Sequence, residues 1–226
     1  MGIILIFFYV TSVGVNINPM YKGKELKHII VDSSPKVLIA LSRIYKNHFL
    51  PLGINLYSVL FQETDFVPEE SREKYRILFE EERVSFQVSD SVSIFQELLE
   101  SYKKVGKVEE ASLFADDIAF LTYTSGTTAG LSKGACNTHR NFVYSSRKPE
   151  VSVSLSHEDV VLSIAPMFHI TGLIVNMGIP LALGSPVVLN YRFHPVVTAH
   201  LIEKVRTRIL MSWHLNSLSF FSFSKV

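Results

Sequence analysis

Residues 118–134 read IAFLTYTSGTTAGLSKG. The first six form an apolar run with the β-branched and aromatic content of a buried strand. Small hydroxyl residues and three glycines follow, and Lys133 is the one charged residue of the stretch. Glycine lets a backbone approach a ligand closely because it lacks Cβ, and successive N–H groups in such a loop form an anion-binding concavity. We therefore expect a phosphate-handling loop at the carboxyl end of a strand.

The loop differs from the Walker phosphate-binding motif, which has four residues between its glycines and then Gly-Lys-Ser/Thr. Here Gly126 and Gly130 enclose three residues, and Lys133 is followed by Gly134. The segment has no Gly-x-Gly-x-x-Gly spacing either. Taken alone, it is equally compatible with a flexible Ser/Thr/Gly turn between a strand and a helix. The wider sequence has to decide between these interpretations.

The bulk composition narrows the class of protein. The 226 residues suffice for one large domain or two small ones. With 22 Lys and Arg against 21 Asp and Glu, nothing favours a nucleic-acid partner. The chain is 47% hydrophobic, which is apolar for a self-contained domain and typical of a fragment that meets further protein. Cys136 is the only cysteine, so no intrachain disulfide can form and a reducing, cytoplasmic setting is expected.

The N-terminal run, residues 2–15, carries no charge. A spanning helix needs ~20 mostly apolar residues, and Asn16, Asn18 and Pro19 interrupt this run too early. A signal peptide would begin with basic residues and end at a small-residue cleavage site, and the run has neither. Its β-branched and aromatic content favours a buried strand, and a membrane or signal role stays as the alternative.

Strand and helix patterns alternate along the rest of the chain. We expect strands at 36–41, 55–61, 76–79, 118–123, 160–165, 186–189 and 208–212. Helices are expected at 22–33, 91–104, 138–144, 169–180 and 195–206, the third one capped by Thr138. In the helix at 91–104, Phe95, Leu98, Leu99 and Tyr102 share a face that we expect in the core, and Ser93 with Gln96 can form a capping box. The alternation predicts an α/β fold of mostly parallel sheets flanked by helices.

Three stretches carry a resemblance to a known family. The string Tyr-Thr-Ser-Gly-Thr-Thr at 123–128, with the following Lys-Gly and the Thr-His-Arg-Asn at 138–141, resembles the signature loop of the AMP-forming acyl-CoA synthetases. Residues 13–21 are similar to the Asn-Pro-x-Tyr segment of that family. Residues 165–172, APMFHITG, are similar to its Pro-x-Phe-His-x-x-Gly segment at the acyl pocket. The likeness runs from about Val13 to Ser212 and implies the N-terminal domain of the adenylate-forming ligase fold.

The resemblance implies a reaction and its participants. A carboxylic acid, expected to be a fatty acid, attacks the α-phosphate of ATP, and coenzyme A then displaces AMP to give acyl-CoA. The partners implied are ATP with Mg²⁺, the acid and coenzyme A, with a peripheral membrane contact also open. No residue of the chain is assigned as a metal ligand. The resemblance assigns the phosphates to Thr124, Ser125, Gly126, Thr127, Thr128, Gly130 and Lys133, catalysis to Lys133 and His169, and the acyl pocket to Phe168, His169 and Gly172.

Several residues depart from the family pattern or have a second interpretation. Ala129 is an extra residue before Gly130, and Ser132 stands where proline is common. One added residue can move Lys133 by up to ~3.5 Å along the loop. His169 is alternatively a core histidine. His139 and Arg140 can simply cap a helix, and Cys136 is expected to pack inside.

The resemblance also divides the chain. Residues 1–212 are expected to be part of the AMP-binding N-terminal domain, and residues 213–226 a divergent tail. The adenine-binding Tyr-Gly-x-Thr-Glu, the ribose-binding Thr-Gly-Asp and the small C-terminal domain of the family are not found after Ser212. Two alternatives to an active ligase therefore stay open. One is a catalytically inactive remnant, which we expect for this chain alone, and the other is an unrelated phosphate-binding module.

Overall fold

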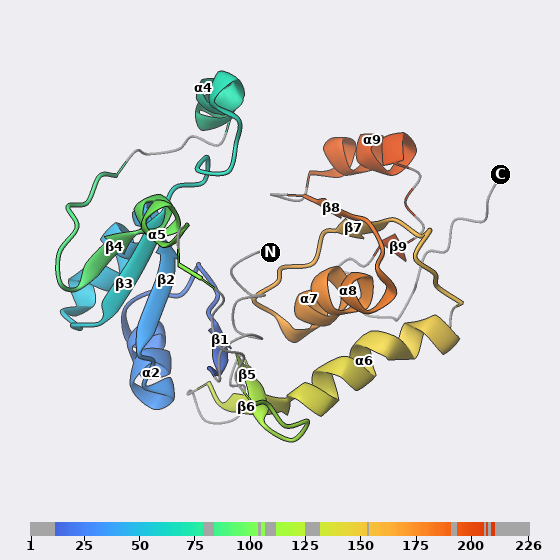
Figure 1. Ribbon diagram of the computed structural model, residues 1–226, viewed down its shortest axis with the longest axis horizontal. Coiled ribbons are helices and arrows are strands. Elements are labelled where there is room, and N and C mark those ends of the chain that lie inside the picture. The colour runs from blue at the N-terminus through green and yellow to red at the C-terminus, as the bar shows by residue number, and fades with distance from the viewer. Residues whose placement is uncertain are drawn as a thin grey trace. The chain divides into compact units, whose positions relative to one another are not determined.

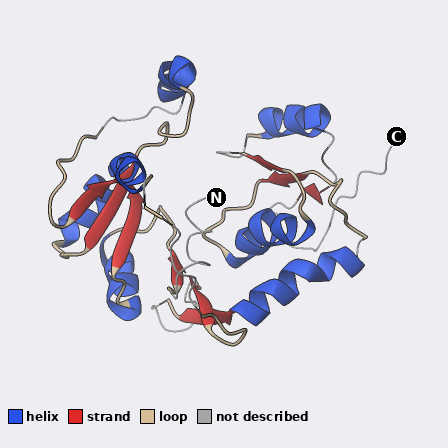
Figure 2. Ribbon diagram, in the orientation of Figure 1, coloured by secondary structure: helices blue, strands red, loops and turns tan. Residues whose placement is uncertain are grey.

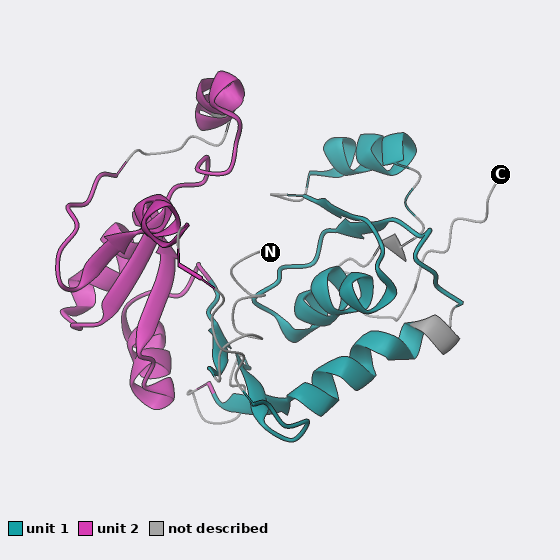
Figure 3. Ribbon diagram, viewed as in Figure 1, with its two compact units in different colours: residues 1–18, 110–124, 133–226 teal, residues 19–109, 125–132 magenta. Residues whose placement is uncertain are grey.

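The computed structural model describes residues 12–78, 84–103, 105–106, 112–124, 132–152, 154–190, 194–205, 207 and 209–210. The chain divides into two compact units (Figure 3). The first unit comprises Met1–Asn18, Glu110–Thr124 and Lys133–Val226, and the second comprises Pro19–Glu109 and Ser125–Ser132. Both units combine helices with parallel strand pairs, which confirms the α/β class (Figure 2).

The second unit is built on a parallel sheet in the order β2-β3-β4 (Figure 1). Its strands are β2 (Val37–Leu41), β3 (Tyr57–Phe61) and β4 (Val92–Ile94). Its helical segments are α2 (Gly23–Ser33), α3 (Ser42–Ile44), η1 (Tyr45–Phe49), η2 (Leu50–Leu52), α4 (Glu69–Leu78) and α5 (Phe95–Tyr102). Helix α2 buries Leu26, Ile29 and Ile30, three residues at helical spacing, so its apolar face supplies part of the core.

The first unit contains two small sheets. One has the order β1-β5-β6, with β1 (Gly14–Asn16) parallel to β5 (Ile118–Tyr123) and β6 (Gly134–Thr138) antiparallel to it. The other has the order β8-β7-β9 and is parallel, with strands β7 (Val161–Ser163), β8 (Val187–Leu189) and β9 (Ile209–Leu210). The helices are α6 (His139–Ser152), α7 (Ile170–Leu173), η3 (Ile174–Gly178), α8 (Ile179–Leu183) and α9 (Pro195–Val205).

The core of the first unit joins strand β5 to the helices. One cluster consists of Ala119, Phe120, Phe142, Leu173 and Met177, and Ile170 and Ile174 pack against it. The Phe120 and Phe142 rings lie 5.4 Å apart between centroids. Strand β1 also lies so close that a Cβ on Gly14 would be 2.9 Å from the same Phe120 ring. Glycine at position 14 is therefore a steric requirement of this strand pairing.

The strand expected at 76–79 is wrong. Residues Glu69–Leu78 form helix α4 instead. The helix begins directly after Pro68. Its charges suit the helix dipole, because Glu69 and Glu70 are acidic residues of the first turn and Arg76 is a basic residue of the last turn. Arg76 also contacts Glu73 at 2.7 Å, one turn earlier. These charges outweigh the short apolar pattern that suggested a strand.

The helix expected at 91–104 begins later, and the apolar face that we expected in the core is only partly buried. Residues Val92–Ile94 pair with β3 as strand β4, and the helix starts at Phe95. The capping box is not formed, because Ser93 contacts the Tyr57 hydroxyl at 2.6 Å and Gln96 donates to the Asp65 carbonyl at 3.0 Å. Leu99 and Tyr102 are 44% and 64% exposed, so the apolar stripe is only partly used by the core.

Three further expectations change in the first unit. Helix α6 starts after Thr138 as predicted but continues past 144 to Ser152. The helix expected to end at Pro180 runs to Leu183, because the π turn at Ile174–Gly178 places Pro180 in the first turn of α8, where its missing N–H costs nothing. Cys136 is exposed on β6. The N-terminal run lies outside the described residues up to position 11, as do the tail from 211 and most of the expected strand at 208–212.

We expect Phe120 to carry much of the stability of the first unit. Replacing it by alanine leaves a cavity between β1, β5 and α6, and such truncations cost about 3–5 kcal/mol. Phe114 is 71% exposed, so Phe114→Ala is the matched control and should change the free energy of unfolding little. Urea denaturation of the three proteins measures the difference. Equal stabilities for the two variants would contradict the core that we describe.

Candidate functional site

The glycine loop leaves the end of strand β5 and returns at strand β6. Its ends are joined by a hydrogen bond from the Thr124 N–H to the Lys133 carbonyl, 3.2 Å long. Thr124 and Lys133 are both exposed. In the part of the chain that the structure describes, the Lys133 side chain makes no hydrogen bond or ion pair. The other residues assigned to the phosphates, Ser125, Gly126, Thr127, Thr128 and Gly130, lie outside the described residues.

Side-chain hydrogen bonds, in addition to the backbone pairing of β5 with β6, hold the base of this hairpin. Thr122 is buried, and its hydroxyl accepts a hydrogen bond of 3.2 Å from the Asn137 amide on β6. The Asn137 amide also donates to the Ala135 carbonyl at 3.0 Å. In the second unit, His28 Nε2 donates to the Ser132 carbonyl at 2.7 Å. The sequence did not indicate Asn137 or His28, since both reach the loop through tertiary contacts.

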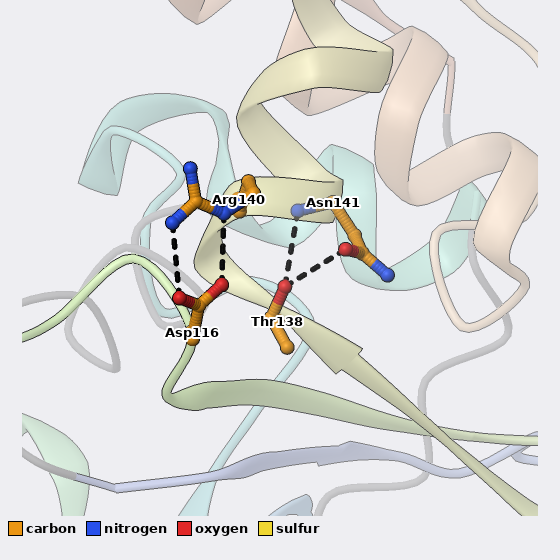
Figure 4. Close-up of polar contacts among 4 residues, drawn as sticks. All are labelled: Asp116, Thr138, Arg140 and Asn141. Atoms are coloured by element: carbon orange, nitrogen blue, oxygen red, sulfur yellow. Dashed lines mark hydrogen bonds and ion pairs between the residues drawn. The ribbon is translucent and has the colours of Figure 1, made fainter.

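The segment Thr138–Asn141 anchors the start of helix α6 (Figure 4). The Thr138 hydroxyl accepts from the Asn141 N–H at 3.2 Å and contacts the Asn141 side chain at 2.8 Å, as an N-cap residue does. The Arg140 guanidinium donates to both Asp116 oxygens, at 2.8 and 2.9 Å. Arg140 is thus committed to an ion pair with the residues that lead into β5, which supports the capping interpretation of this motif.

His169 lies at the N-terminus of helix α7 and has a defined ring orientation. Its Nδ1 accepts a hydrogen bond of 3.2 Å from the Thr171 N–H, so the ring proton of the neutral imidazole is on Nε2. Its own N–H donates to the Pro166 carbonyl at 3.1 Å, and its carbonyl accepts from the Leu173 N–H at 2.9 Å. Partial burial lowers the pKa of His169 below its ordinary value. The side chain is therefore a neutral Nε2–H donor at neutral pH.

Phe168 and Gly172 differ in their surroundings. Phe168 is half-buried, and Gly172 is buried in α7. A Cβ on Gly172 would lie 2.1 Å from the Pro166 carbonyl oxygen, so only glycine lets α7 pack against the Pro166–His169 turn. Close packing therefore explains why position 172 is a glycine, in addition to the pocket role that the resemblance assigned to it.

A hollow of about 430 Å³ lies between α6 and the α7–η3 helix. Ile170 and Ile174 line one wall, and Ile170 directly follows His169. The other lining residues are Asn137, Arg140, Asn141, Phe142, Tyr144 and Ser145. A larger groove of about 930 Å³ is lined by Leu113–Ala115 and residues of α6, and neither this groove nor the smaller hollow is lined by an assigned site residue. We take the smaller hollow as the better candidate for a substrate because Ile170 on its wall is the neighbour of His169 in the chain.

These features coincide with a sequence match over most of the chain. Residues 8–213 match the family of AMP-binding enzymes. The chain belongs to this family. Among curated relatives, it is 27% identical over 202 residues to a probable 4-coumarate–CoA ligase of Dictyostelium discoideum, covering 85% of this chain and 34% of that protein. It is 25% identical over 202 residues to a long-chain-fatty-acid–CoA ligase of Bacillus subtilis, covering 84% of this chain and 35% of that one. The chain thus spans about a third of these relatives.

Solved structures of the AMP-binding family share its fold. The structure of a long-chain-fatty-acid–CoA ligase from Archaeoglobus fulgidus superposes with a TM-score of 0.68 at 27% identity, covering 92% of this chain and 36% of that one. An anthranilate–CoA ligase in complex with anthranoyl-AMP superposes with a TM-score of 0.69 at 18% identity, covering 91% of this chain and 36% of that one. The expected adenylate-forming ligase fold is confirmed by these likenesses.

The part of the chain that the structure describes contains no group of three His, Cys, Asp or Glu residues that could hold a metal ion. The hydroxyl-rich loop likewise offers no carboxylate. None of the helices in the described ranges is both long and apolar enough to cross a membrane.

The ion pair at the α6 N-terminus predicts a pH dependence. Its hydrogen bonds with Arg140, and then the charge of Arg140, hold the pKa of Asp116 below its ordinary value. A lowered folded-state pKa stabilises the fold above the unfolded value of ~3.9, and this contribution is lost as the pH falls through the lowered pKa. We expect a small difference in thermal midpoint between wild type and Asp116→Asn at neutral pH, because the pair is exposed, and convergence in acid.

Asp90 supplies the control for this experiment, because it is exposed in the turn before β4. Asp90→Asn should leave the midpoint at neutral pH unchanged. Differential scanning fluorimetry from neutral to acidic pH measures all three proteins. A gap between wild type and Asp116→Asn that widened in acid would contradict the assignment.

Proposed function

We propose that this chain takes part in the ATP-dependent activation of a carboxylic acid to an acyl-adenylate and then to its coenzyme A thioester. The observation that carries the proposal is the hairpin at the end of β5. The Thr124–Lys133 hydrogen bond closes a loop of hydroxyl and glycine residues beside an exposed lysine, in the stretch that the family match covers. Such a loop suits the phosphates of ATP, because oriented N–H groups and a cation stabilise the charge of the leaving pyrophosphate.

The acid is proposed to lie near His169. Its neutral Nε2–H can donate a hydrogen bond to a carboxylate or phosphoryl oxygen without a proton transfer. The hollow beside Ile170 and Ile174 lies within the range of about 300–1,000 Å³ typical of small-molecule sites. Its wall combines these two apolar side chains with the polar residues of α6. This arrangement supports an acid with an apolar body.

The acid that we propose is a fatty acid. Relatives at nearly the same identity include a long-chain-fatty-acid–CoA ligase and a probable 4-coumarate–CoA ligase, so an aromatic acid is the competing substrate. The Archaeoglobus fulgidus likeness, at 27% identity, favours the fatty acid. Magnesium enters the proposal with the nucleotide, as Mg-ATP, and not as an ion held by the described residues.

The reaction is tested by release of pyrophosphate from Mg-ATP in the presence of laurate, palmitate or 4-coumarate, with and without coenzyme A. Acid-dependent release by the purified chain supports the proposal, and its order among the acids identifies the substrate class. Binding of Mg-ATP and acid without pyrophosphate release would favour the alternative of a binding-competent but inactive chain. Failure to bind Mg-ATP would contradict both.

Lys133 is expected to dominate the affinity for Mg-ATP. A hydrogen bond to a charged group is typically worth ~1.5–3 kcal/mol, so Lys133→Ala should weaken binding about 10- to 150-fold. Lys74 is also an exposed lysine, on helix α4, and Lys74→Ala is the matched control with unchanged affinity. Isothermal titration calorimetry measures both. Equal affinities for Lys133→Ala and wild type would show that the extra Ala129 has moved the ammonium away from the phosphates.

The hollow between α6 and η3 is expected to take the acyl group. Ser145 is exposed on α6 and lines the hollow, so a tryptophan there would fill the space with little strain on the core. We expect Ser145→Trp to weaken palmitate binding about tenfold, or 1.4 kcal/mol, and to leave Mg-ATP affinity unchanged.

Ser101, exposed on α5, gives the control variant Ser101→Trp, which adds the same apolar surface away from the hollow. Equilibrium dialysis with labelled palmitate measures both variants. If Ser101→Trp and Ser145→Trp bound palmitate alike, the acyl group would have to bind elsewhere.

A further inference from the structure

Asn176 is a fully buried amide that the proposed mechanism does not use. It lies in the π turn η3 at 0% exposure. Its Nδ2 donates a hydrogen bond of 2.6 Å to the Ala165 carbonyl, eleven residues earlier. A carbonyl can only accept, so the contact itself determines which end of the amide faces Ala165. The Oδ1 atom then points elsewhere in the core and makes no hydrogen bond with the part of the chain that the structure describes.

Stability alone does not explain this amide. With asparagine at 176, one buried acceptor lacks a donor, namely Oδ1. With leucine, which has nearly the same shape, one buried acceptor would also lack a donor, namely the Ala165 carbonyl. The number of unsatisfied groups is the same, and leucine would add apolar contacts in a buried position. Asparagine at position 176 therefore brings no net gain in stability over leucine. Its Nδ2 hydrogen bond instead bears on the placement of the segment that contains Ala165.

The Ala165 carbonyl leads directly into the turn that carries His169. Pro166 follows Ala165, and its carbonyl accepts the His169 N–H at 3.1 Å. Helix α7 presses on the same turn, because a Cβ at Gly172 would lie 2.1 Å from the Pro166 oxygen and 2.9 Å from the Ala165 oxygen. Asn176 extends this contact by one more turn of the helix. The amide and the glycine together clamp the start of the turn onto the α7–η3 helix.

We propose that Asn176 is a positioning residue for His169: its amide holds the Ala165 carbonyl and thereby fixes the turn in which His169 Nδ1 accepts from the Thr171 N–H. The π turn supports this role, because such wide turns are frequently found at functional sites. The inference rests on the proposed role of His169, but its structural part can be tested without any turnover.

The test uses the full 226-residue chain with ¹⁵N-labelled histidine, because the ¹⁵N shifts of Nδ1 and Nε2 report which nitrogen carries the proton. The chain has eight histidines, and His169→Gln identifies the His169 signals by their loss. Above the pKa of the ring, wild type should show one tautomer at His169, with the proton on Nε2. Asn176→Leu should lose this single-tautomer signal while its thermal midpoint stays level or rises.

The matched control removes another amide in the same unit. Asn190 donates to the Thr198 hydroxyl at 3.2 Å, at the junction of β8 and α9. Asn190→Leu should leave the His169 signals unchanged. An unaltered tautomer in Asn176→Leu would overturn the inference. So would a variant that fails to fold or unfolds at a much lower temperature, because the amide would then serve stability.

The same variants separate this inference from the proposed function. If His169→Gln bound palmitate and Mg-ATP as tightly as wild type, the proposed role of His169 would be wrong, whereas the tautomer result for Asn176→Leu would still show whether Asn176 fixes the ring. If His169→Gln weakened the binding of palmitate or Mg-ATP and Asn176→Leu kept the wild-type tautomer, the role of His169 would stand and the positioning role of Asn176 would fall.

Discussion

The first unit depends on the way strand β5 is held along both edges. Its parallel pairing with β1 requires a glycine opposite Phe120, and its antiparallel pairing with β6 brings Gly134 opposite Tyr123. Phe120 is 1% exposed, so its face of the strand is sealed by the helices. A strand fixed on both edges and one face has little freedom at its end, and this constraint sets the position of Thr124, which directly follows the strand.

The same core connects the loop to His169. Ala119 and Phe120 of β5 share one cluster with Leu173 and Met177 of the α7–η3 helix. That helix begins at His169, which its N-terminal hydrogen bonds hold in place. The strand that presents the loop and the helix that presents the imidazole are therefore packed into one close-packed interior, where small displacements are costly. Two sequence motifs some forty residues apart are placed by one set of apolar contacts.

The two cations Arg140 and Lys133, which follow the glycine loop in the sequence, differ in their charge partners. Arg140 lies in the motif that follows the loop, but its guanidinium is paired with Asp116 and steadies the entry to β5. Lys133 is exposed at the closing end of the hairpin. A bidentate guanidinium suits a fixed carboxylate, and a flexible ammonium suits a mobile phosphate. The pairing of Arg140 explains why a conspicuous basic motif contributes to structure, while the lysine is available to a ligand.

Local patterns in the sequence were sufficient to predict those strands and helices that have a clear apolar periodicity or capping residue of their own. The apolar run at 118–123 ends at a hydroxyl-rich loop, and strand β5 has these bounds; helix α2 and the Thr138 cap follow in the same way from periodicity and capping chemistry. Strand β6 could not be found so, because GACNT has no strand pattern and becomes extended only by pairing with the free edge of β5. The π turn, the Asn176 amide and the hollow between α6 and η3 likewise arise from residues far apart in sequence. The sequence alone thus determined the family and the residue composition of the loop, whereas tertiary packing decided which side chains lie near His169 and the ends of the loop, because such contacts depend on neighbours that no local pattern encodes.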